Sequence, residues 1–380
     1  MKYCKRCVMP DTRPGIQFDQ NGVCYPCLTY DKRKKIDWKA RWHELERLAD
    51  KYRGSNGDYY DCMITVSSGK DSHYQVYTMK ERLGMNPLLL SLDNFSWTET
   101  GRQNMRNLLE VFGCDLHMFS LNRRVAGKMT RKAFEYQLIP TWYWDRAVYA
   151  YPLQAAIRFS LPLIVYGENI NYEYGGAQTE ETYSALDQIS NDVVKPVPWE
   201  VWLDGEIQMK DLNPLIYPTA EEIQAAKLEP IYLSYFEPWD GYRHFELARK
   251  YGFKSLDEEW AREGLAENYD QIDTIGYNVH PWLKFIKFGH QHNTDVLSQW
   301  VRSGRVSRGE AVEAVKKNEH ILDQRMLEDF LEFTGYTKED FWRIVDRFVN
   351  RDILEKKDGL WRLKPAVIWA LERGGEVCFE

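Results

Sequence analysis

The chain has 380 residues, of which 44% are hydrophobic and 28% are charged, a composition typical of a globular protein with about two or three domains. Its formal net charge of -7 argues against a broad contact with a nucleic-acid backbone. The first seven residues contain no apolar signal segment, and no apolar run approaches the roughly 20 residues of a membrane span. We therefore expect a cytoplasmic protein with reduced thiols and no membrane partner.

Four of the seven cysteines stand in the first 27 residues, as the pairs Cys4-x-x-Cys7 and Cys24-x-x-Cys27. This spacing predicts a zinc ribbon over residues 1–30, in which each pair supplies two thiolates to one tetrahedral Zn²⁺ ion. Because four thiolates leave no open position for a water molecule, the predicted zinc is structural. A redox-active cysteine pair or an iron–sulfur site is the alternative.

The rest of the chain predicts an α/β domain between two helical segments. Apolar and aromatic residues recur at helical spacing within 31–57, which predicts a connecting helix. From residue 58, short apolar strands alternate with helices, and this predicts a parallel sheet covered on both faces. Strands are expected at 61–66, 87–92, 116–119 and 162–167, and helices at 72–83, 99–113, 123–138 and 145–159. The α/β domain is expected over 58–240, with 195–240 leaving the sheet, and a mainly helical region over 241–380.

The segment Ser67–Ser72 joins the first of these strands to a helix. A strand, a tight turn of small residues and a helix start direct backbone N–H groups at an anion. The two terminal serines add hydroxyl donors, Lys70 adds charge, and Asp71 is expected to cap the helix or to help hold a metal. The ending of a Walker A loop is missing. The alternative is a serine-rich helix cap beside an ordinary strand.

This segment resembles the SGGxDS loop of the PP-loop ATP pyrophosphatases, with Ser68 in place of the first glycine. The resemblance implies a domain of the adenine nucleotide alpha hydrolase type, which cleaves ATP between its α and β phosphates. AMP would pass to an oxygen of the substrate. Pyrophosphate would stay on the loop residues Ser67, Ser68, Gly69, Lys70, Asp71 and Ser72.

Polar side chains also follow two other predicted strands, and ligands of parallel sheets gather at the carboxyl ends of the strands. Asp93 and Asn94 are expected to contact ribose or adenine, and Glu168 and Asn169 to contact Mg²⁺ or the reacting group. Each of these four also fits a helix cap or a turn. The aromatic stretch 134–152 fits core packing or the wall of a substrate cleft, and the loop 172–176 would cover such a cleft.

Charged residues and caps mark the C-terminal region. Arg302, Arg305 and Arg308 are spaced three apart, which predicts a shared helix face that either meets a carboxylate or phosphate or is solvated. His290 and His292 lack a third spaced ligand, so we interpret them as loop histidines. Further expectations are capping boxes at Thr219–Glu222 and Ser255–Glu258, helices at 320–334 and 338–350 with Thr337 capping the second, and a β pair near 353–363.

Over essentially its whole length, the chain resembles the N-acetyl sugar amidotransferases. The resemblance rests on residues 5–15, the second cysteine pair, the loop Ser67–Ser72, and the segments 287–295 and 300–310. It implies that ATP adenylates the oxygen of a sugar acetamido group and that ammonia then displaces AMP to give an acetamidino group. Enzymes of this family act on pseudaminic acid or on a diacetamido-uronic acid of O-antigen.

The same resemblance sets the expected cofactors and residue roles. ATP and Mg²⁺ are the expected cofactors, beside the structural zinc. We expect Lys70, Asp71 and Glu168 to be catalytic, and we expect the sugar to contact Asn169, Lys287, Asp295 and Arg302.

No glutaminase nucleophile motif is present in the sequence. The resemblance therefore implies separate glutaminase and cyclase-like subunits that supply ammonia. Two alternatives stay open. A tRNA-thiolating PP-loop enzyme predicts catalytic cysteines in the α/β domain and a basic surface. A non-catalytic zinc-ribbon interaction protein predicts no ATP turnover.

Overall fold

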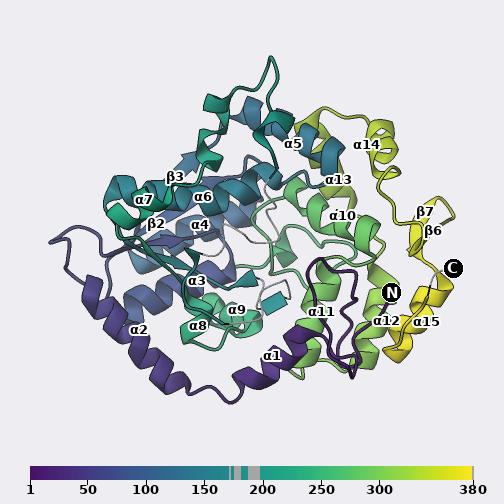
Figure 1. Ribbon diagram of the computed structural model, residues 1–380, viewed down its shortest axis with the longest axis horizontal. Coiled ribbons are helices and arrows are strands. Elements are labelled where there is room, and N and C mark those ends of the chain that lie inside the picture. Colours follow the sequence, from purple (N-terminus) through teal and green to yellow (C-terminus); the bar gives the residue numbers. More distant parts are fainter. Residues whose placement is uncertain (171–172, 175–180, 187–196, 379–380) are drawn as a thin grey trace.

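A five-stranded parallel sheet lies at the centre of the α/β part of the molecule (Figure 1). The computed structural model describes residues 1–170, 173–174, 181–186 and 197–378. The strand order is β3-β2-β1-β4-β5. The strands are β1 (Cys62–Thr65), β2 (Pro87–Asp93), β3 (Asp115–Ser120), β4 (Leu163–Tyr166) and β5 (Glu229–Tyr232). The predicted α/β class with a parallel sheet is confirmed.

The strand β5 was not predicted, because residues 195–240 were expected to leave the sheet. That expectation is wrong for Glu229–Tyr232, which pair in parallel with β4. The strand is only four residues long and contains Pro230, which cannot donate to a ladder. Such a strand is tolerated at the edge of a sheet, which is where β5 lies.

Alternating side chains of the strands enter two separate cores, one on each face of the sheet. Ile64, Leu89 and Val165 pack with the apolar residues of helices on one face. Met63, Leu88 and Ile164 pack with helix residues on the other face. Burial on both faces explains why these strands are continuously apolar in the sequence.

The helices of the first half follow the predicted order, with two differences. The expected connecting helix is two helices, because Asp37 caps a new start by accepting from Ala40 N–H. The helix after the loop begins at Lys70, two residues earlier than expected, and continues as a π-helix. The helical elements are α1 (Tyr25–Arg33), α2 (Trp38–Tyr52), α3 (Lys70–Val76), η1 (Tyr77–Arg82), α4 (Glu99–Phe112), α5 (Arg123–Gln137), α6 (Trp142–Phe159), η5 (Trp199–Val201), η6 (Met209–Leu215) and α7 (Ala220–Ala225).

The C-terminal region is mainly helical and is closed by a small antiparallel hairpin, as expected. Thr337 caps its helix by accepting from Asp340 N–H, whereas Ser255 makes no such cap, so the capping box expected there is wrong. Its elements are α8 (Leu233–Phe236), α9 (Gly241–Lys250), η7 (Leu256–Glu258), η8 (Gly276–Asn278), α10 (Val279–Phe288), α11 (His292–Arg302), α12 (Arg308–Asn318), α13 (Gln324–Thr334), α14 (Lys338–Val345), β6 (Leu354–Lys357), β7 (Leu360–Leu363) and α15 (Pro365–Arg373).

The N-terminal segment packs on this C-terminal region, and Figure 1 shows the two ends of the chain side by side. Tyr3 and Val8 are buried in the C-terminal core. Tyr3 N–H donates to Gly375 O (3.0 Å), and Thr12 Oγ1 donates to Phe288 O (2.6 Å). Within the described ranges, no helix has the length and low charge that crossing a membrane requires.

Candidate active site

The turn Ser67–Ser72 lies at the carboxyl end of β1 and leads directly into α3. Ser67 N–H donates to Ser72 Oγ (2.8 Å), and Gly69 N–H donates to Ser67 Oγ (3.1 Å). Ser68 and Ser72 are buried, while Ser67 is exposed. The two hydroxyls expected to bind an anion therefore also fix the shape of the turn.

The start of α3 offers free backbone donors. Among the residues that the structure describes, no carbonyl or side chain accepts from the N–H groups of Ser68, Lys70, Asp71 and Ser72. Gly69 is the N-cap and has no side chain to satisfy them. Unpaired N–H groups at a helix start attract anions. The turn thus has the donors that a phosphate group requires.

Lys70 is buried, and its ammonium group lies between two carboxylates. Its Nζ atom is 2.8 Å from Asp71 Oδ2 and 2.8 Å from Asp270 Oδ1. Burial lowers the pKa of Lys70, but the two carboxylates outweigh this and hold the pKa well above its ordinary value. A permanently charged lysine therefore stands at the mouth of the turn, held in part by the C-terminal region.

A second residue of the C-terminal region holds Asp71. His244 Nδ1 on α9 lies 2.6 Å from Asp71 Oδ1, and the buried His244 ring stacks on Tyr74 of α3 with centroids 3.8 Å apart. Burial raises the pKa of Asp71, but Lys70 and His244 reverse this and keep the pKa below its usual value. The carboxylate is thus ionised and fixed in direction.

Glu168, which follows β4, belongs to the same charged group. Burial, and then the charge of Asp71, raise the pKa of Glu168 to about 8. Burial and the charges of Glu168 and Asp270 likewise raise the pKa of Tyr174. Asp71 and Asp270 contact the ammonium group of Lys70, and Glu168 interacts with these charges electrostatically, so at neutral pH Glu168 is mostly protonated.

A cleft opens beside the loop residues Lys70 and Asp71, between α1, α9 and α11. Two of its arginines are already paired, since Arg33 contacts Glu173, and Arg305 contacts both oxygens of Asp240 at 2.9 and 3.0 Å. Aromatic side chains form much of the remaining wall, namely Tyr30, Tyr174, Trp239, Tyr242, Tyr269 and Trp300. Aromatic walls with a few fixed polar groups are typical of sites for small ring-shaped ligands.

The loop expected to cover the cleft is described only at Glu173 and Tyr174, and both line the cleft. Tyr172, Gly175 and Gly176 lie outside the described residues. The aromatic stretch 134–152 does not line this cleft. Its Trp142 and Tyr143 are buried in a separate core, so the core-packing interpretation holds for them.

Asp93 ends β2 and Asn94 follows it, but the structure places both residues away from this cleft. Asp93 Oδ1 accepts from Phe95 N–H (3.2 Å) and Trp97 Nε1 (2.9 Å), so its carboxylate holds a turn. Asn94 Oδ1 accepts from Ser96 N–H (3.0 Å). Asn94 lines a second, mainly apolar pocket together with Trp144. Both residues thus have the turn role that was their alternative.

The four residues expected to contact the sugar are not brought together. Asn169 is buried behind the loop, where its N–H donates to Ser234 Oγ (3.2 Å), and Arg302 lines the cleft. Lys287 Nζ instead donates to the carbonyls of Gln137 and Leu138 (3.3 Å each). Asp295 is buried between Arg13 and Lys284. The last two therefore connect parts of the fold outside the cleft.

The arginines at 302, 305 and 308 do not share a helix face, so that expectation is wrong. α11 ends at Arg302 and α12 begins at Arg308, with Arg305 in the connection. The carboxylate contact is confirmed for Arg305, which pairs with Asp240. Gly304, with φ +75°, lies in this connection and separates the two helices.

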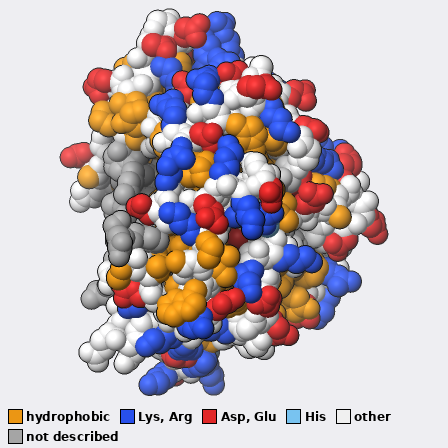
Figure 2. Space-filling view, turned by 90° about the vertical axis from the view of Figure 1, so that its right-hand side faces the viewer, with side chains coloured by type: hydrophobic (Ala, Val, Ile, Leu, Met, Phe, Trp, Pro, Cys, Tyr) orange, Lys and Arg blue, Asp and Glu red, His pale blue; other side chains and the backbone are white. Residues whose placement is uncertain are grey.

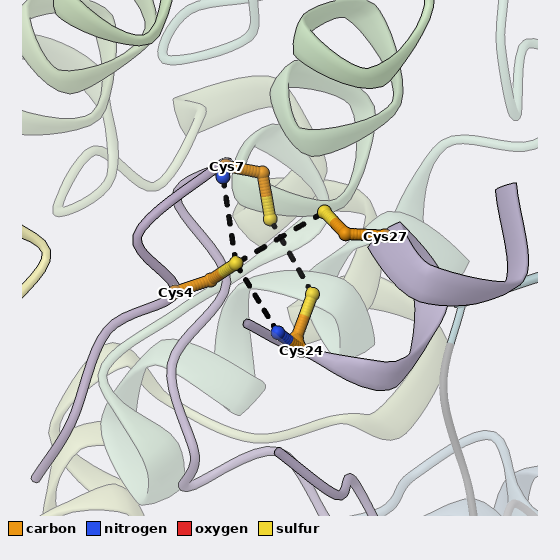
Figure 3. A group of neighbouring side chains, drawn as sticks. All are labelled: Cys4, Cys7, Cys24 and Cys27. Carbon is orange, nitrogen blue, oxygen red and sulfur yellow. Dashed lines mark hydrogen bonds between the residues drawn. The ribbon is translucent and has the colours of Figure 1, made fainter. Parts of the chain in front are cut away.

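The four N-terminal cysteines converge on one point (Figure 3). Their sulfur atoms all lie within 4.8 Å of one another and are buried, with Cys7 and Cys24 separated by 3.6 Å and Cys4 and Cys27 by 4.0 Å. A tetrahedral ion with bonds of about 2.3 Å requires separations of about 3.8 Å. The donor set therefore fits Zn²⁺, and within the described chain it is the only such group of potential ligands.

Three residues of the site escaped the sequence analysis: Asp270, His244 and Tyr269. Asp270 lies 200 positions from Lys70, and His244 lies 173 positions from Asp71. Neither belongs to a motif with fixed spacing. The one available signal was the acidic and aromatic run Glu267–Asp270 in a non-periodic stretch, which is weak.

Substitution of Gly69 tests whether a phosphate approaches the turn. A Cβ atom at Gly69 would lie 3.2 Å from Ser67 Oγ, the atom that accepts the hydrogen bond from Gly69 N–H. We expect Gly69→Ala to weaken ATP binding about tenfold, a loss of about 1.4 kcal/mol, with little change in melting temperature. Gly205→Ala is the control, because nothing lies within 4 Å of a Cβ there. Unchanged ATP affinity of Gly69→Ala in calorimetry would exclude this turn as the phosphate site.

A family model matches part of the C-terminal region. Residues 234–367 match the family described as "LPS biosynthesis protein WbpG-like, C-terminal domain". The matched segment contains His244, Asp270 and Arg302, whereas the turn Ser67–Ser72 lies outside it.

Two individual proteins are also similar to the chain. An uncharacterized protein from Methanocaldococcus jannaschii is 28% identical over 128 residues, which are 32% of this chain and 42% of that protein. The chain thus spans about two fifths of the length of this curated relative. The NMN synthetase from Francisella tularensis superposes with a TM-score of 0.27 and 13% identity over 51% of this chain and 94% of that one. A TM-score this low does not show a common fold.

Proposed function

We propose that the chain is an ATP-dependent amidotransferase that converts an acetamido group of a sugar into an acetamidino group during the synthesis of a surface glycan. The observation that carries the proposal is the turn Ser67–Ser72, whose unpaired N–H groups lie at the carboxyl end of β1 beside the charged Lys70. The similarity of residues 234–367 to a lipopolysaccharide biosynthesis family supports the glycan part.

The proposed reaction has two displacements. The amide oxygen of the sugar attacks the α phosphorus of ATP, the bond to the β phosphate breaks, and pyrophosphate leaves. Ammonia then adds to the activated amide carbon, and AMP leaves with the former amide oxygen. An amide is a poor electrophile, so its oxygen must first become part of a good leaving group.

The residues of the turn have the chemistry for the first displacement. Fixed N–H donors stabilise charge that develops on the departing pyrophosphate, and such donors contribute about 10²- to 10³-fold each to the rate. Lys70 adds a positive charge that Asp71 and Asp270 hold in place. The aromatic wall of the cleft suits the faces of a sugar ring.

Mg²⁺, when bound with ATP, would neutralise phosphate charge. Asp71 and Asp270, which both contact Lys70 at 2.8 Å, are the carboxyl groups available to hold it. This suits Mg²⁺, which takes one or two carboxylates and completes its shell with phosphates and water.

Glu168→Gln is expected to lower kcat/KM by about 10²- to 10⁴-fold, because a positioned general base contributes that much. With a pKa of about 8, Glu168 can accept a proton in a minor fraction of molecules at neutral pH and in most of them above pH 8. In the parent protein, kcat/KM should therefore rise with pH through 8 and level off only above it, and the variant should lose this rise. The measurement is AMP release as a function of pH. Glu313→Gln, on the exposed surface, is the control. A variant with the parent rate and an intact fold would remove Glu168 from the mechanism.

The function itself is tested by mass spectrometry of acetamido sugars incubated with the protein, ATP, Mg²⁺ and ammonium. The panel would include pseudaminic acid and a UDP-linked diacetamido-uronic acid. We expect one product in which an amide oxygen has become NH, with equal amounts of AMP and pyrophosphate. AMP without a changed sugar would keep the ATP chemistry and overturn the substrate. No AMP with any sugar, even with a glutaminase partner added, would overturn the enzyme assignment.

We also propose that ammonia comes from separate glutaminase and cyclase-like subunits.

The tRNA-thiolating alternative requires catalytic cysteines in the α/β domain, and it gains no support. The two cysteines of that domain are Cys62, which is buried in β1, and Cys114, which is half-buried beside β3. Figure 2 shows one face of the molecule, on which Lys and Arg are interspersed with Asp and Glu rather than gathered in one basic field.

A further inference from the structure

We propose that the cysteine-bound metal holds the wall of the cleft in place, and that Arg302 is the positioning residue that links the two. This inference rests on the metal site and the cleft alone, and it holds whether or not the proposed reaction is correct. It departs from the expectation of a separate N-terminal module, because one helix carries a metal ligand and cleft residues together.

Helix α1 connects the metal site to the cleft directly. Cys24 is its N-cap and Cys27 its third residue. Pro26, Thr29, Tyr30 and Arg33 of the same helix line the cleft. These four residues recur at the spacing of one helix face. A metal ion that fixes Cys27 therefore also fixes the position of this face.

Helix α11 approaches the cysteines from the other side. Val301 packs against the four cysteines, and the neighbouring Gln299, Trp300 and Arg302 line the cleft. The connection to α12 is held as well, since Arg308 Nε donates to Cys7 O (3.1 Å). The metal site thus contacts two elements that both line the cleft.

Arg302 has a charge that the metal site requires. Four thiolates around one divalent ion leave a net charge of about -2, and a buried charge is costly unless an opposite charge compensates it. Arg302 is the last residue of α11 and directly follows Val301, which packs against the cysteine cluster. Arg302 is therefore the residue of α11 that can supply this opposite charge.

One end of the same guanidinium group remains available. Arg302 Nη1 is buried, and within the described part of the chain it has no hydrogen-bond partner. A buried donor without a partner is costly, and Arg302 lines the cleft. A ligand oxygen in the cleft would satisfy this donor. Arg302 thus adjoins both the cysteine cluster and the cleft.

Two measurements on the full-length, zinc-loaded protein test the link. The first is the rate of zinc transfer to a colorimetric chelator. We expect about tenfold faster transfer from Arg302→Gln, because residues next to metal ligands typically change metal affinity by 10- to 100-fold. Arg302→Lys, which keeps the charge, should stay within about twofold of the parent. Arg343→Gln is the matched control, since Arg343 is exposed and pairs with Asp340 on its own helix.

The second measurement is hydrogen–deuterium exchange of the parent protein with and without zinc. We expect faster exchange after zinc removal both in residues 25–33 and in residues 296–303. This readout requires neither ATP nor any variant, so it remains decisive if Arg302→Gln does not fold. The inference is overturned if zinc leaves a folded Arg302→Gln at the parent rate. It is equally overturned if the faster exchange is confined to residues 1–24.

Discussion

Replacement of Asp71 by Asn is expected to lower the rate of AMP formation by about 10²- to 10³-fold, the scale of losing one fixed electrostatic group at a developing charge. Asp71 holds the ammonium group of Lys70 at 2.8 Å and the ring of His244 at 2.6 Å. An amide keeps the volume and one acceptor oxygen but carries no charge. Lys70 would then be held by Asp270 alone, and its ammonium group would turn away from the phosphates.

The effect on folding must be separated from the effect on the reaction. Removal of one partner of a buried ion pair costs about 3–5 kcal/mol, so the melting temperature of Asp71→Asn should also fall. Circular dichroism at the assay temperature shows whether the variant is folded. Asp50→Asn removes the same charge from an exposed helix position and should change neither quantity.

The companion variant Asp270→Asn tests the contribution of the C-terminal region. It should lower the rate by only about tenfold, because Asp71 still contacts Lys70. Parent-like AMP formation by a folded Asp71→Asn would show that the turn is not the ATP site. An Asp270→Asn variant indistinguishable from the parent would show that the C-terminal region takes no part in it.

Loss of the bound metal is expected to lower the melting temperature by roughly 10 °C, because metal affinity at a cysteine site contributes several kcal/mol to folding. The cysteines hold a segment that buries Tyr3 and Val8 in the C-terminal core. The same segment donates a hydrogen bond from Thr12 to Phe288 O. Once the metal is gone, the turns around Cys4 and Cys24 lose their anchor, and both chain ends should loosen.

Cys24→Ser provides the test. The parent should contain one zinc per chain and the variant none, with no visible absorbance in either, since an iron–sulfur cluster would give colour. Cys378→Ser is the matched control, because Cys378 is exposed and lies outside the cysteine group. If Cys24→Ser loses zinc but melts at the parent temperature, the metal does not stabilise the fold.

Local patterns were sufficient to predict much of the fold. The strands β1, β2 and β4 were visible as apolar runs because both of their faces are buried. The cysteine pairs and the Thr337 cap were visible because their partners lie within a few residues. The strand β5 was missed because Pro230 and its short length hide an edge strand.

The sequence by itself determined the parallel sheet, the turn at the end of β1 and the four-thiolate site, since neighbouring residues fix each of these. Only the tertiary structure decided which groups surround Lys70. Asp270 and His244 reach the turn from the C-terminal region, over separations of 200 and 173 residues. It also placed Lys287 and Asp295 outside the cleft and Arg302 beside the cysteines. Contacts over such distances depend on how whole helices pack, and no spacing in the sequence records that packing.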